Sequence, residues 1–291
     1  MTSPDPFMLE PSAVRRSFDA AAASFDASAA VHAEIRTRLL ERLDVIRMEP
    51  DVVLDLGAGT GHGSRALKDR YKSALVVAAD FSAPMLVRAA KQQRLFRGFA
   101  RVATDAHRLA LRAGSVDMVF SNLMLQWSHD PDAVLQQIRR VLKPNGLLTF
   151  TSLGPDTLRE LRSVWSKVDT YVHVHRFIDM HDLGDALMRA GFAEPVMDTQ
   201  RLTITYRDGE TLLQELVGSG SGNVAIGRRH GLTARAAMTA VRAGYEELRR
   251  EGVLPVSVEV VYGHAWVGSV KGEKREASGE VRVPVSRIGR R

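Results

Sequence analysis

A short apolar run that ends in a glycine-rich loop constrains the fold of this chain more than any other feature. Residues 51–56 follow Pro50 and lead directly into Gly57, Gly59 and Gly61. Such a run is typical of a buried strand in a parallel sheet. Glycines let the backbone turn sharply and approach a ligand closely, and a helix that begins after them offers free N–H groups. The sequence therefore predicts a strand, a ligand-binding loop and a helix in succession.

Strands and helices alternate after this loop. We expect strands at 74–79, 99–103, 116–121 and 147–151, helices at 61–69, 82–93 and 130–142, and a turn at 144–146. Alternation of this kind is typical of a parallel sheet with helices on both faces.

The alternation loosens after residue 152. Helices are expected at 157–168, 180–190, 210–217 and 233–251, strands at 195–206 and 256–266, and a first helix at 12–46. The predicted fold class is α/β, a Rossmann-like doubly wound seven-stranded sheet with an N-terminal helix and a helical insertion. One domain at 1–267 would comprise an N-terminal helical cap at 12–47, a cofactor-binding core at 51–152, and the insertion with late strands at 155–251.

Composition and charge exclude several classes of protein. The 291 residues include no cysteine, which excludes disulfides, thiolate metal sites and cysteine nucleophiles. No signal peptide or membrane-length apolar run is visible, so we expect a cytoplasmic protein without a membrane partner. The end of the chain, 268–291, is basic, with seven Lys and Arg against three Glu from residue 271 onward. It is interpreted as a solvated, disordered tail rather than a nucleic-acid contact.

Two aspartates flank the glycine loop in a way that favours one kind of ligand. Asp55 lies two residues before the first glycine, and Asp80 ends the second expected strand. A carboxylate at a strand end can accept hydrogen bonds from ribose hydroxyls, and open α/β sheets bind ligands at this edge. The G-x-G-x-G spacing differs from the G-x-G-x-x-G of dinucleotide sites and disfavours an NAD-dependent oxidoreductase. The alternative is an ordinary strand–helix turn with a capping aspartate.

Residues 51–152 resemble the class I S-adenosylmethionine methyltransferases. In that family the aspartate and glycines of the loop surround the methionine part, the next strand-end carboxylate binds the ribose, and later loops meet the adenine. The resemblance implies the following cofactor-binding residues: Phe18, Phe25, Asp55, Gly57, Ala58, Gly59, Gly61, Asp80, Phe81, Met85, Asp105, Ala106, Asn122 and Leu123. Asp105 as a solvated loop residue, Asn122 as a turn former, and Phe18 and Phe25 as helix packing are the alternatives.

A narrower resemblance covers about 12–267. The stretches 15–18, 121–127, 156–161 and 175–177 are similar to the malonyl-acyl carrier protein O-methyltransferases of biotin synthesis. This resemblance implies methyl transfer from S-adenosylmethionine to the free carboxylate of a malonyl thioester, with malonyl-loaded acyl carrier protein as the partner. The stretches 156–161, 182–184 and 189–192 also resemble a complex I assembly factor that hydroxylates arginine. A non-catalytic cofactor-binding module is a further alternative.

The implied chemistry needs few catalytic groups. A carboxylate is already anionic at neutral pH, so no general base is required. An arginine can hold a carboxylate with two hydrogen bonds, and Arg176 stands in the matching His-Arg-Phe stretch. Gln126 and Trp127 are expected to line the methyl-transfer pocket. The structural alternatives are a surface ion pair for Arg176 and plain core packing for Trp127.

Two further motifs receive structural interpretations. His173 and His175 alternate, but no third ligand stands at suitable spacing, so we expect no metal site. The run 218–222, Gly-Ser-Gly-Ser-Gly, lacks the Lys-Ser/Thr of a phosphate-binding loop. It is interpreted as a flexible loop that borders the path of a phosphopantetheine arm.

Overall fold

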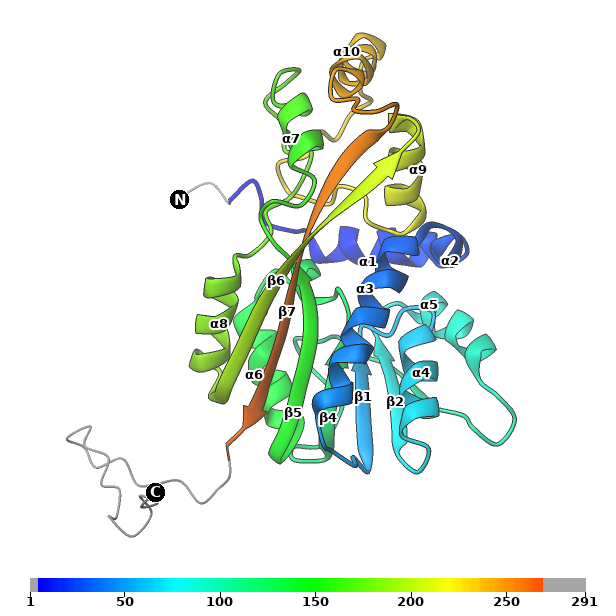
Figure 1. Ribbon diagram of the computed structural model, residues 1–291, viewed down its shortest axis with the longest axis vertical. Helices are drawn as coiled ribbons and strands as arrows, with labels where there is room; N and C mark the ends of the chain where they lie inside the picture. Colours follow the sequence, from blue (N-terminus) through cyan, green and yellow to red (C-terminus); the bar gives the residue numbers. More distant parts are fainter. Residues whose placement is uncertain (1–4, 269–291) are drawn as a thin grey trace, which may run out of the picture.

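A computed structural model of the chain describes residues 5–268, and its centre is one seven-stranded sheet in the order β3-β2-β1-β4-β5-β7-β6 (Figure 1). The strands are β1 Val52–Leu56, β2 Leu75–Asp80, β3 Ala100–Ala103, β4 Val116–Ser121, β5 Leu142–Leu153, β6 Phe192–Tyr206 and β7 Leu254–Val267. Strands β1 to β5 pair in parallel, whereas β7 runs antiparallel to both β5 and β6. The predicted doubly wound, Rossmann-like α/β class is confirmed.

Helices cover both faces of the sheet, as a parallel sheet requires. The helices are α1 Pro11–Ala21, α2 Phe25–Ser28, α3 Ala30–Glu41, α4 His62–Arg70, α5 Ala83–Ala89, α6 Pro131–Val141, α7 Arg159–Trp165, α8 Met180–Arg189, α9 Gly209–Gly218 and α10 Arg235–Glu246. Apolar side chains of α6 and α8 pack on one face, and those of α3, α4 and α5 pack on the other. Leu39 and Ile138 illustrate the two layers, since each is fully buried.

A second apolar cluster forms above the carboxyl ends of the parallel strands. The long strands β6 and β7 extend past the rest of the sheet and meet α7, α9 and α10 there (Figure 1). We call this region the cap; its cluster includes Leu161, Trp165, Leu212 and Tyr245. The insertion predicted at 155–251 therefore belongs to two regions of the structure. Helix α8 and much of β6 pack with the sheet, whereas α7, α9 and α10 form the cap.

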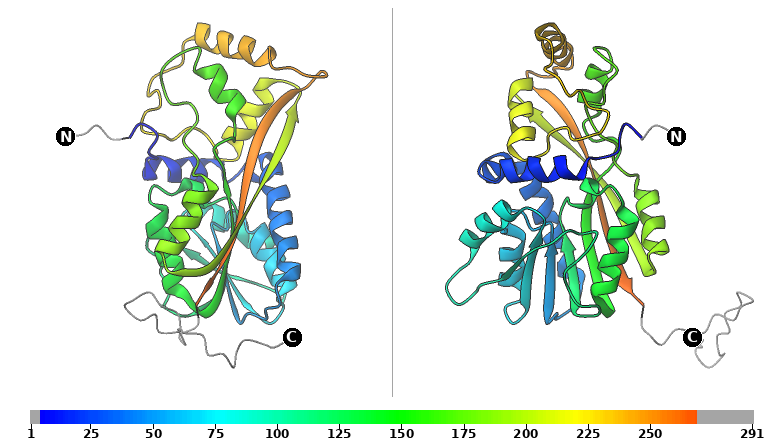
Figure 2. Two further views of the ribbon diagram at one scale, coloured as in Figure 1. Left: turned by 60° about the vertical axis from the view of Figure 1, so that its left-hand side comes forward. Right: turned by 180° about the vertical axis from the view of Figure 1, so that it is seen from behind.

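The N-terminal segment is not the single helix predicted over 12–46. It breaks between α1 and α2 and again at Ala29, where φ and ψ leave the helical region. Ser24 donates a hydrogen bond from Oγ to the Gly218 carbonyl at 2.9 Å, which ties the break to the end of α9. The break lets α1 lie between the cap and the strand ends while α3 descends along the sheet (Figure 2).

Three other expectations are corrected or left outside the structure. The helix predicted over 233–251 ends at Glu246, and the chain turns at Gly252, which has φ of +82°. The turn predicted at 144–146 lies inside β5, as an irregularity with Asn145 at φ +60°. The predicted tail, 268–291, lies outside the described residues except for Gly268. Within residues 5–268 no helix has the length and apolar character needed to span a bilayer.

Candidate active site

A cavity of about 520 Å³ opens at the carboxyl ends of the first four strands, and we call it the strand-end cavity. The structure brings most of the predicted cofactor-binding residues to its wall: Phe18, Phe25, Gly57, Gly59, Asp80, Phe81, Met85, Asp105, Ala106, Asn122 and Leu123. Asp55, Ala58 and Gly61 are not part of the wall. The parallel arrangement explains the gathering, because the loops that follow neighbouring parallel strands emerge at one edge.

The glycine loop takes the left-handed backbone conformations that its sequence permits. Gly57 has φ of +77° and Gly61 has φ of +85°. A Cβ on Gly57 would lie 2.6 Å from Cβ of Met124, and one on Gly61 would lie 2.7 Å from Cβ of Ala89. Glycine is therefore required at both positions by conformation and by space.

Asp80 is the buried carboxylate at the centre of this edge. Its Oδ2 accepts a hydrogen bond from Gly59 N–H at 2.8 Å, and its Oδ1 accepts one from Ser82 N–H at 2.8 Å. Burial raises the pKa of Asp80 to about 6, although the backbone hydrogen bonds oppose that rise. The carboxylate thus fixes the loop and still lines the cavity, where it can accept from a ligand hydroxyl.

Asp55 supports the loop from beneath. It is buried, and its Oδ2 accepts a hydrogen bond from the hydroxyl of Ser64 on α4. Burial raises the pKa of Asp55 to about 6. A Cβ on Gly63 would lie 2.9 Å from the same oxygen, so α4 approaches this carboxylate closely. Its contact with a ligand stays a prediction.

Asp105 and Asn122 follow β3 and β4, the two strands that flank β2 and β1 in the sheet, and both line the cavity. Asp105 accepts a hydrogen bond from His107 N–H at 2.9 Å, which shapes its loop. Asn122 donates from Nδ2 to the His32 carbonyl at 3.2 Å, and its Oδ1 accepts from the Thr151 hydroxyl at 2.9 Å. Asn122 therefore joins α3 to β5 beside the cavity.

Helix α1 forms an aromatic roof over the strand-end cavity. Phe18 meets Phe81 and Trp127 edge to face, with ring centroids 5.9 Å and 5.2 Å apart. Ser17 donates from Oγ to the Gly220 carbonyl at 3.0 Å, so the roof is tied to the loop after α9. Phe18 thus forms part of the cavity wall and links it to Trp127.

A second cavity of about 260 Å³ lies between the strand ends and the cap, and we call it the cap cavity. It shares three wall residues with the strand-end cavity: His32, Leu123 and Trp127. Most of its other wall residues are apolar side chains from the cap, such as Leu161 and Leu212. The two cavities therefore adjoin across a wall that includes an indole ring.

Three buried polar atoms at this wall have no hydrogen-bond partner: Gln126 Oε1, Trp127 Nε1 and His175 Nε2. All three side chains line the cap cavity, and we call the group the polar corner. The rings of Trp127 and His175 lie 5.0 Å apart. Burial lowers the pKa of His175 to about 4, helped by the positive charge of Arg162, so His175 is neutral at pH 7.

Known proteins match both the core and the whole chain. A family model described as a methyltransferase domain matches residues 54–150. A malonyl-[acyl-carrier protein] O-methyltransferase of Methylovorus sp. (strain MP688) is 48% identical over 269 residues, covering 90% of each chain. A malonyl-[acyl-carrier protein] O-methyltransferase 1 of Coxiella burnetii is 42% identical over 287 residues, covering 98% of each chain. The chain belongs to this O-methyltransferase family.

Solved structures agree on the fold. The YcgJ protein of Bacillus subtilis superposes with a TM-score of 0.58 at 13% identity, covering 80% of this chain and 99% of that one. Phosphoethanolamine N-methyltransferase 2 of Haemonchus contortus, in complex with S-adenosyl-L-methionine, gives 0.51 at 17% identity, covering 86% and 57%. At these low identities, the similarity shows only that the chain shares the fold of these two structures.

The structure does not bring Arg176 to either cavity of this O-methyltransferase. Its side chain is 65% exposed, its guanidinium lies 3.5 Å from Asp5, and it stacks over Phe7 at 4.7 Å. His175 and Phe177 on either side are buried and line the cap cavity, so alternate side chains point in opposite directions. The role predicted for Arg176 stays a prediction, and its position favours His175 as the residue that meets a substrate.

Other motifs of the family-like stretches have structural partners. His173 stacks on Trp165 at 3.5 Å and lies 2.7 Å from Asp169, so it belongs to the cap. Within residues 5–268 no group of three potential metal ligands is present. Ser219, Ser221 and Gly222, from the loop expected to border an acyl arm, line the cap cavity.

Sequence reasoning missed several wall residues of the strand-end cavity. Arg15 and His32 line it together with Phe18 and Phe25. A helical spacing of three residues puts Arg15 and Phe18 on a common side of α1. Phe25 and His32 belong to α2 and α3, and their rings meet edge to face at 5.4 Å across the break at Ala29. Burial lowers the pKa of His32 to about 4, so it is neutral at pH 7. Helical spacing from Phe18 would have identified Arg15, whereas His32 depends on the break at Ala29, which the sequence did not predict.

Proposed function

We propose that this methyltransferase transfers a methyl group from S-adenosylmethionine to the free carboxylate of malonyl-acyl carrier protein, giving the methyl ester that starts biotin synthesis. The observation that carries the proposal is the pair of adjoining cavities with Trp127 in their common wall. One cavity suits a nucleoside and the other a mainly apolar acyl group. The names of relatives that match nine-tenths of the chain favour this reaction over arginine hydroxylation by an assembly factor.

The strand-end cavity fits S-adenosylmethionine in size and in chemistry. Its volume of about 520 Å³ lies in the range of small-molecule sites. Asp80 offers a buried acceptor for ribose hydroxyls, and Phe81 and Met85 offer apolar surface beside it. Asp105 lies in the next loop, where it would accept a hydrogen bond from the adenine.

The bound cofactor supplies a methyl group on a sulfonium: a carboxylate oxygen forms the new C–O bond, the S–C bond breaks, and its electron pair stays on sulfur. No proton has to move, so the chain needs no general base. Both charges vanish in the product, and apolar surroundings strengthen the attraction between them on the way. Leu123 and Trp127 line both cavities and would align the two groups, while Phe18 excludes water from above.

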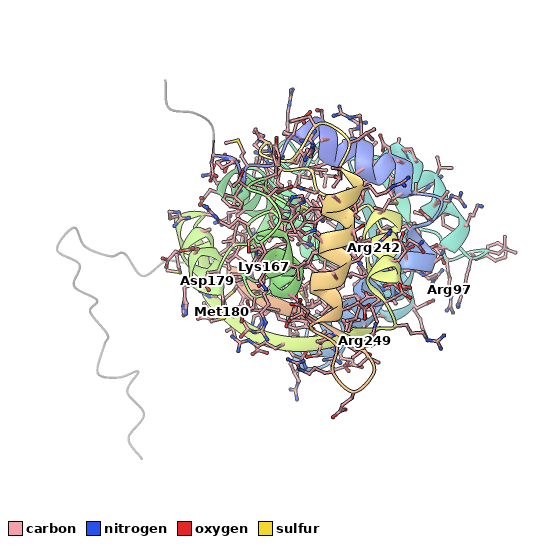
Figure 3. All side chains as sticks on the ribbon, turned by 90° about the horizontal axis from the view of Figure 1, so that it is seen from above. Arg97, Lys167, Asp179, Met180, Arg242 and Arg249 are labelled. Atoms are coloured by element: carbon pink, nitrogen blue, oxygen red, sulfur yellow. The ribbon has the colours of Figure 1, made fainter. Side chains whose placement is uncertain are left out.

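Acyl carrier protein is the proposed partner, and it would approach from the cap. Seen from above, α10 crosses the cap with Lys167 on one side and Arg242 on the other (Figure 3). Arg242 lies 2.8 Å from Glu210, so its charge is partly balanced, and Lys167 is exposed. Basic side chains on this side favour encounter with an acidic protein at low salt.

Mass spectrometry with isotope-labelled S-adenosylmethionine and malonyl-acyl carrier protein tests the proposal. We expect one labelled methyl ester on the malonyl group and none on acetyl-acyl carrier protein, which lacks the free carboxylate. Cofactor binding without transfer to malonyl-acyl carrier protein would overturn the proposed reaction while leaving the fold assignment intact.

A further inference from the structure

We infer that Trp127 Nε1 and His175 Nε2 receive the carboxylate of the acyl substrate, so that two neutral donors rather than an arginine position the nucleophile. The inference rests on the proposed function, because it assumes an acyl carboxylate in the cap cavity. It assigns a recognition role to the polar corner that neither the strand-end cavity nor the glycine loop can fill.

The first argument is the unsatisfied state of the two donors. Each atom is buried and has no partner. A buried polar group without a partner costs about 1–3 kcal/mol, and such groups are rare in folded proteins. An indole nitrogen can only donate, and a neutral imidazole donates from one nitrogen. A carboxylate in the cap cavity would supply the missing acceptors for both after a small side-chain rotation.

The second argument is the distribution of charge. Among the described residues that line the cap cavity there is no lysine or arginine, and the acidic Glu215 accepts a hydrogen bond from the Tyr206 hydroxyl at 2.8 Å. A carboxylate in this cavity therefore meets only neutral donors. Arg162 lies behind the polar corner, where it donates to the carbonyls of Pro155 and Thr157 at 3.1 Å. Its charge acts on His175 and favours an anion beside that ring.

The third argument is chemical. An arginine that holds both carboxylate oxygens in a bidentate pair stabilises the negative charge that must attack the methyl group. Neutral donors orient the carboxylate with less stabilisation of its charge, so the oxygen stays more nucleophilic. The wall position of Trp127, between the two cavities, puts such a donor beside the path of methyl transfer.

Gln126 contributes differently from the other two members of the polar corner. Its Nε2 donates to the Leu123 carbonyl at 2.9 Å, which fixes the amide and leaves Oε1 as the unpaired atom. An acceptor does not attract a carboxylate. This oxygen suits an N–H donor, such as an amide of the pantetheine arm, so Gln126 is outside the carboxylate receptor.

Two donor-removing variants with matched controls test the inference. Trp127→Phe and His175→Phe remove the N–H groups and keep aromatic rings. Their controls are Trp266→Phe, in β7, and His181→Phe, an exposed residue of α8; neither residue lines the strand-end cavity or the cap cavity. We expect kcat/KM for malonyl-acyl carrier protein to fall about 10- to 100-fold in each donor variant, as the loss of a hydrogen bond to a charged group predicts. His175→Gln, which keeps an N–H donor, should recover part of the activity.

Binding separates this inference from the proposed function. Calorimetry on cofactor-free protein should show that the wild type binds malonyl-acyl carrier protein more tightly than acetyl-acyl carrier protein. Both donor variants should lose that preference, and His175→Phe should leave the affinity for S-adenosylmethionine within about twofold. Donor variants that keep the preference and the activity overturn the inference. A wild type that binds malonyl-acyl carrier protein but transfers no methyl group would overturn the proposed reaction. The binding preference of the variants would still decide whether the polar corner receives the carboxylate. Should His175→Phe fail to fold, Trp127→Phe and His175→Gln decide it.

Discussion

The two cavities of this molecule adjoin, yet they are built in opposite ways. The strand-end cavity is the more polar of the two, with the buried carboxylate of Asp80 beside backbone N–H groups of the glycine loop. The cap cavity is mainly apolar, and its unsatisfied groups are neutral. Asp80 has a pKa raised to about 6 and His175 one lowered to about 4, because burial disfavours the charged form of each. One cavity offers the carboxylate of Asp80 to a ligand, and the other holds His175 in its neutral form.

This contrast shows how one fold divides the work of methyl transfer. In the proposed reaction, the doubly wound sheet holds the nucleoside with groups at the ends of individual strands. The cap would then supply a second, mainly apolar environment in which the substrate carboxylate is poorly solvated and therefore reactive. Trp127 belongs to both environments and joins them. The contrast can be tested by removing the charge of Asp80 from the strand-end cavity, or by removing the N–H donors of Trp127 and His175 from the cap cavity.

The largest effect is expected for Asp80→Ala in the strand-end cavity. The variant loses a ribose acceptor and the two hydrogen bonds that hold Gly59 and Ser82. We expect affinity for S-adenosylmethionine to fall at least about 100-fold, which corresponds to about 3 kcal/mol. Calorimetry measures it, with Asp132→Ala as control because Asp132 only pairs with Arg189 at the surface. Unchanged affinity would remove Asp80 from ligand binding.

Gly57→Ala should have the next largest effect. The new Cβ would lie 2.6 Å from Met124 Cβ, at a backbone φ of +77°. We expect a loss of about 2–4 kcal/mol in the free energy of unfolding, from clash and strain together. Gly114→Ala is the matched control, because Gly114 has φ of +60° and no atom within 4 Å of its Cβ position. Urea unfolding of both variants separates strain from clash, and equal losses would contradict the close packing of the loop on Met124.

A smaller effect is expected from pH, and it has opposite signs for the stability of the ligand-free protein and for its affinity for S-adenosylmethionine. Burial raises the pKa values of Asp55 and Asp80 to about 6 in the ligand-free protein, from an ordinary value of 3.8. A raised folded-state pKa contributes stability that is fully present below about pH 4 and is lost as the pH rises through about 6. We therefore expect these two groups to add of the order of 2 kcal/mol to the free energy of unfolding at pH 5 relative to pH 7.5.

Ligand binding should respond in the reverse direction, since only the ionised Asp80 offers a full set of acceptors. Affinity for S-adenosylmethionine should weaken below pH 6. Urea titrations and calorimetry at pH 5 and 7.5 check both signs. Asp80→Asn should flatten the affinity response and reduce the stability response, because the Asp55 contribution remains. A wild type whose affinity is unchanged between the two pH values would show that the ligand does not need the ionised carboxylate.

The strand-end cavity was largely predictable from the sequence, whereas the cap cavity was not. Asp80 ends one strand and Asn122 directly follows another, and both apolar runs are visible in the sequence, so the sheet edge that gathers the two residues could be inferred. The cap cavity joins residues from Ser28 to Val258, and no local pattern records that β6 and β7 extend beyond the sheet to carry α7, α9 and α10. Gln126 and Trp127 were found only through a resemblance. His175 was noticed in the His-Arg-Phe stretch and in a metal pair that was set aside, but the role there was assigned to Arg176.

The smallest effect is expected for Arg176→Gln, and it sharpens the comparison between the two readings of the His-Arg-Phe stretch. The sequence predicts that Arg176 holds the carboxylate, which would make its loss as severe as that of a substrate ligand. Its exposed side chain pairs with Asp5 and stacks on Phe7 instead. Exposed ion pairs contribute about 0–1 kcal/mol to the stability of a protein. Because Arg176 also lines neither cavity, kcat/KM for malonyl-acyl carrier protein should fall by less than about threefold. Steady-state assays beside His175→Phe make the decision: a loss in Arg176→Gln as large as that of His175→Phe would mean that Arg176 turns inward on binding, and that the carboxylate is held by a cation after all.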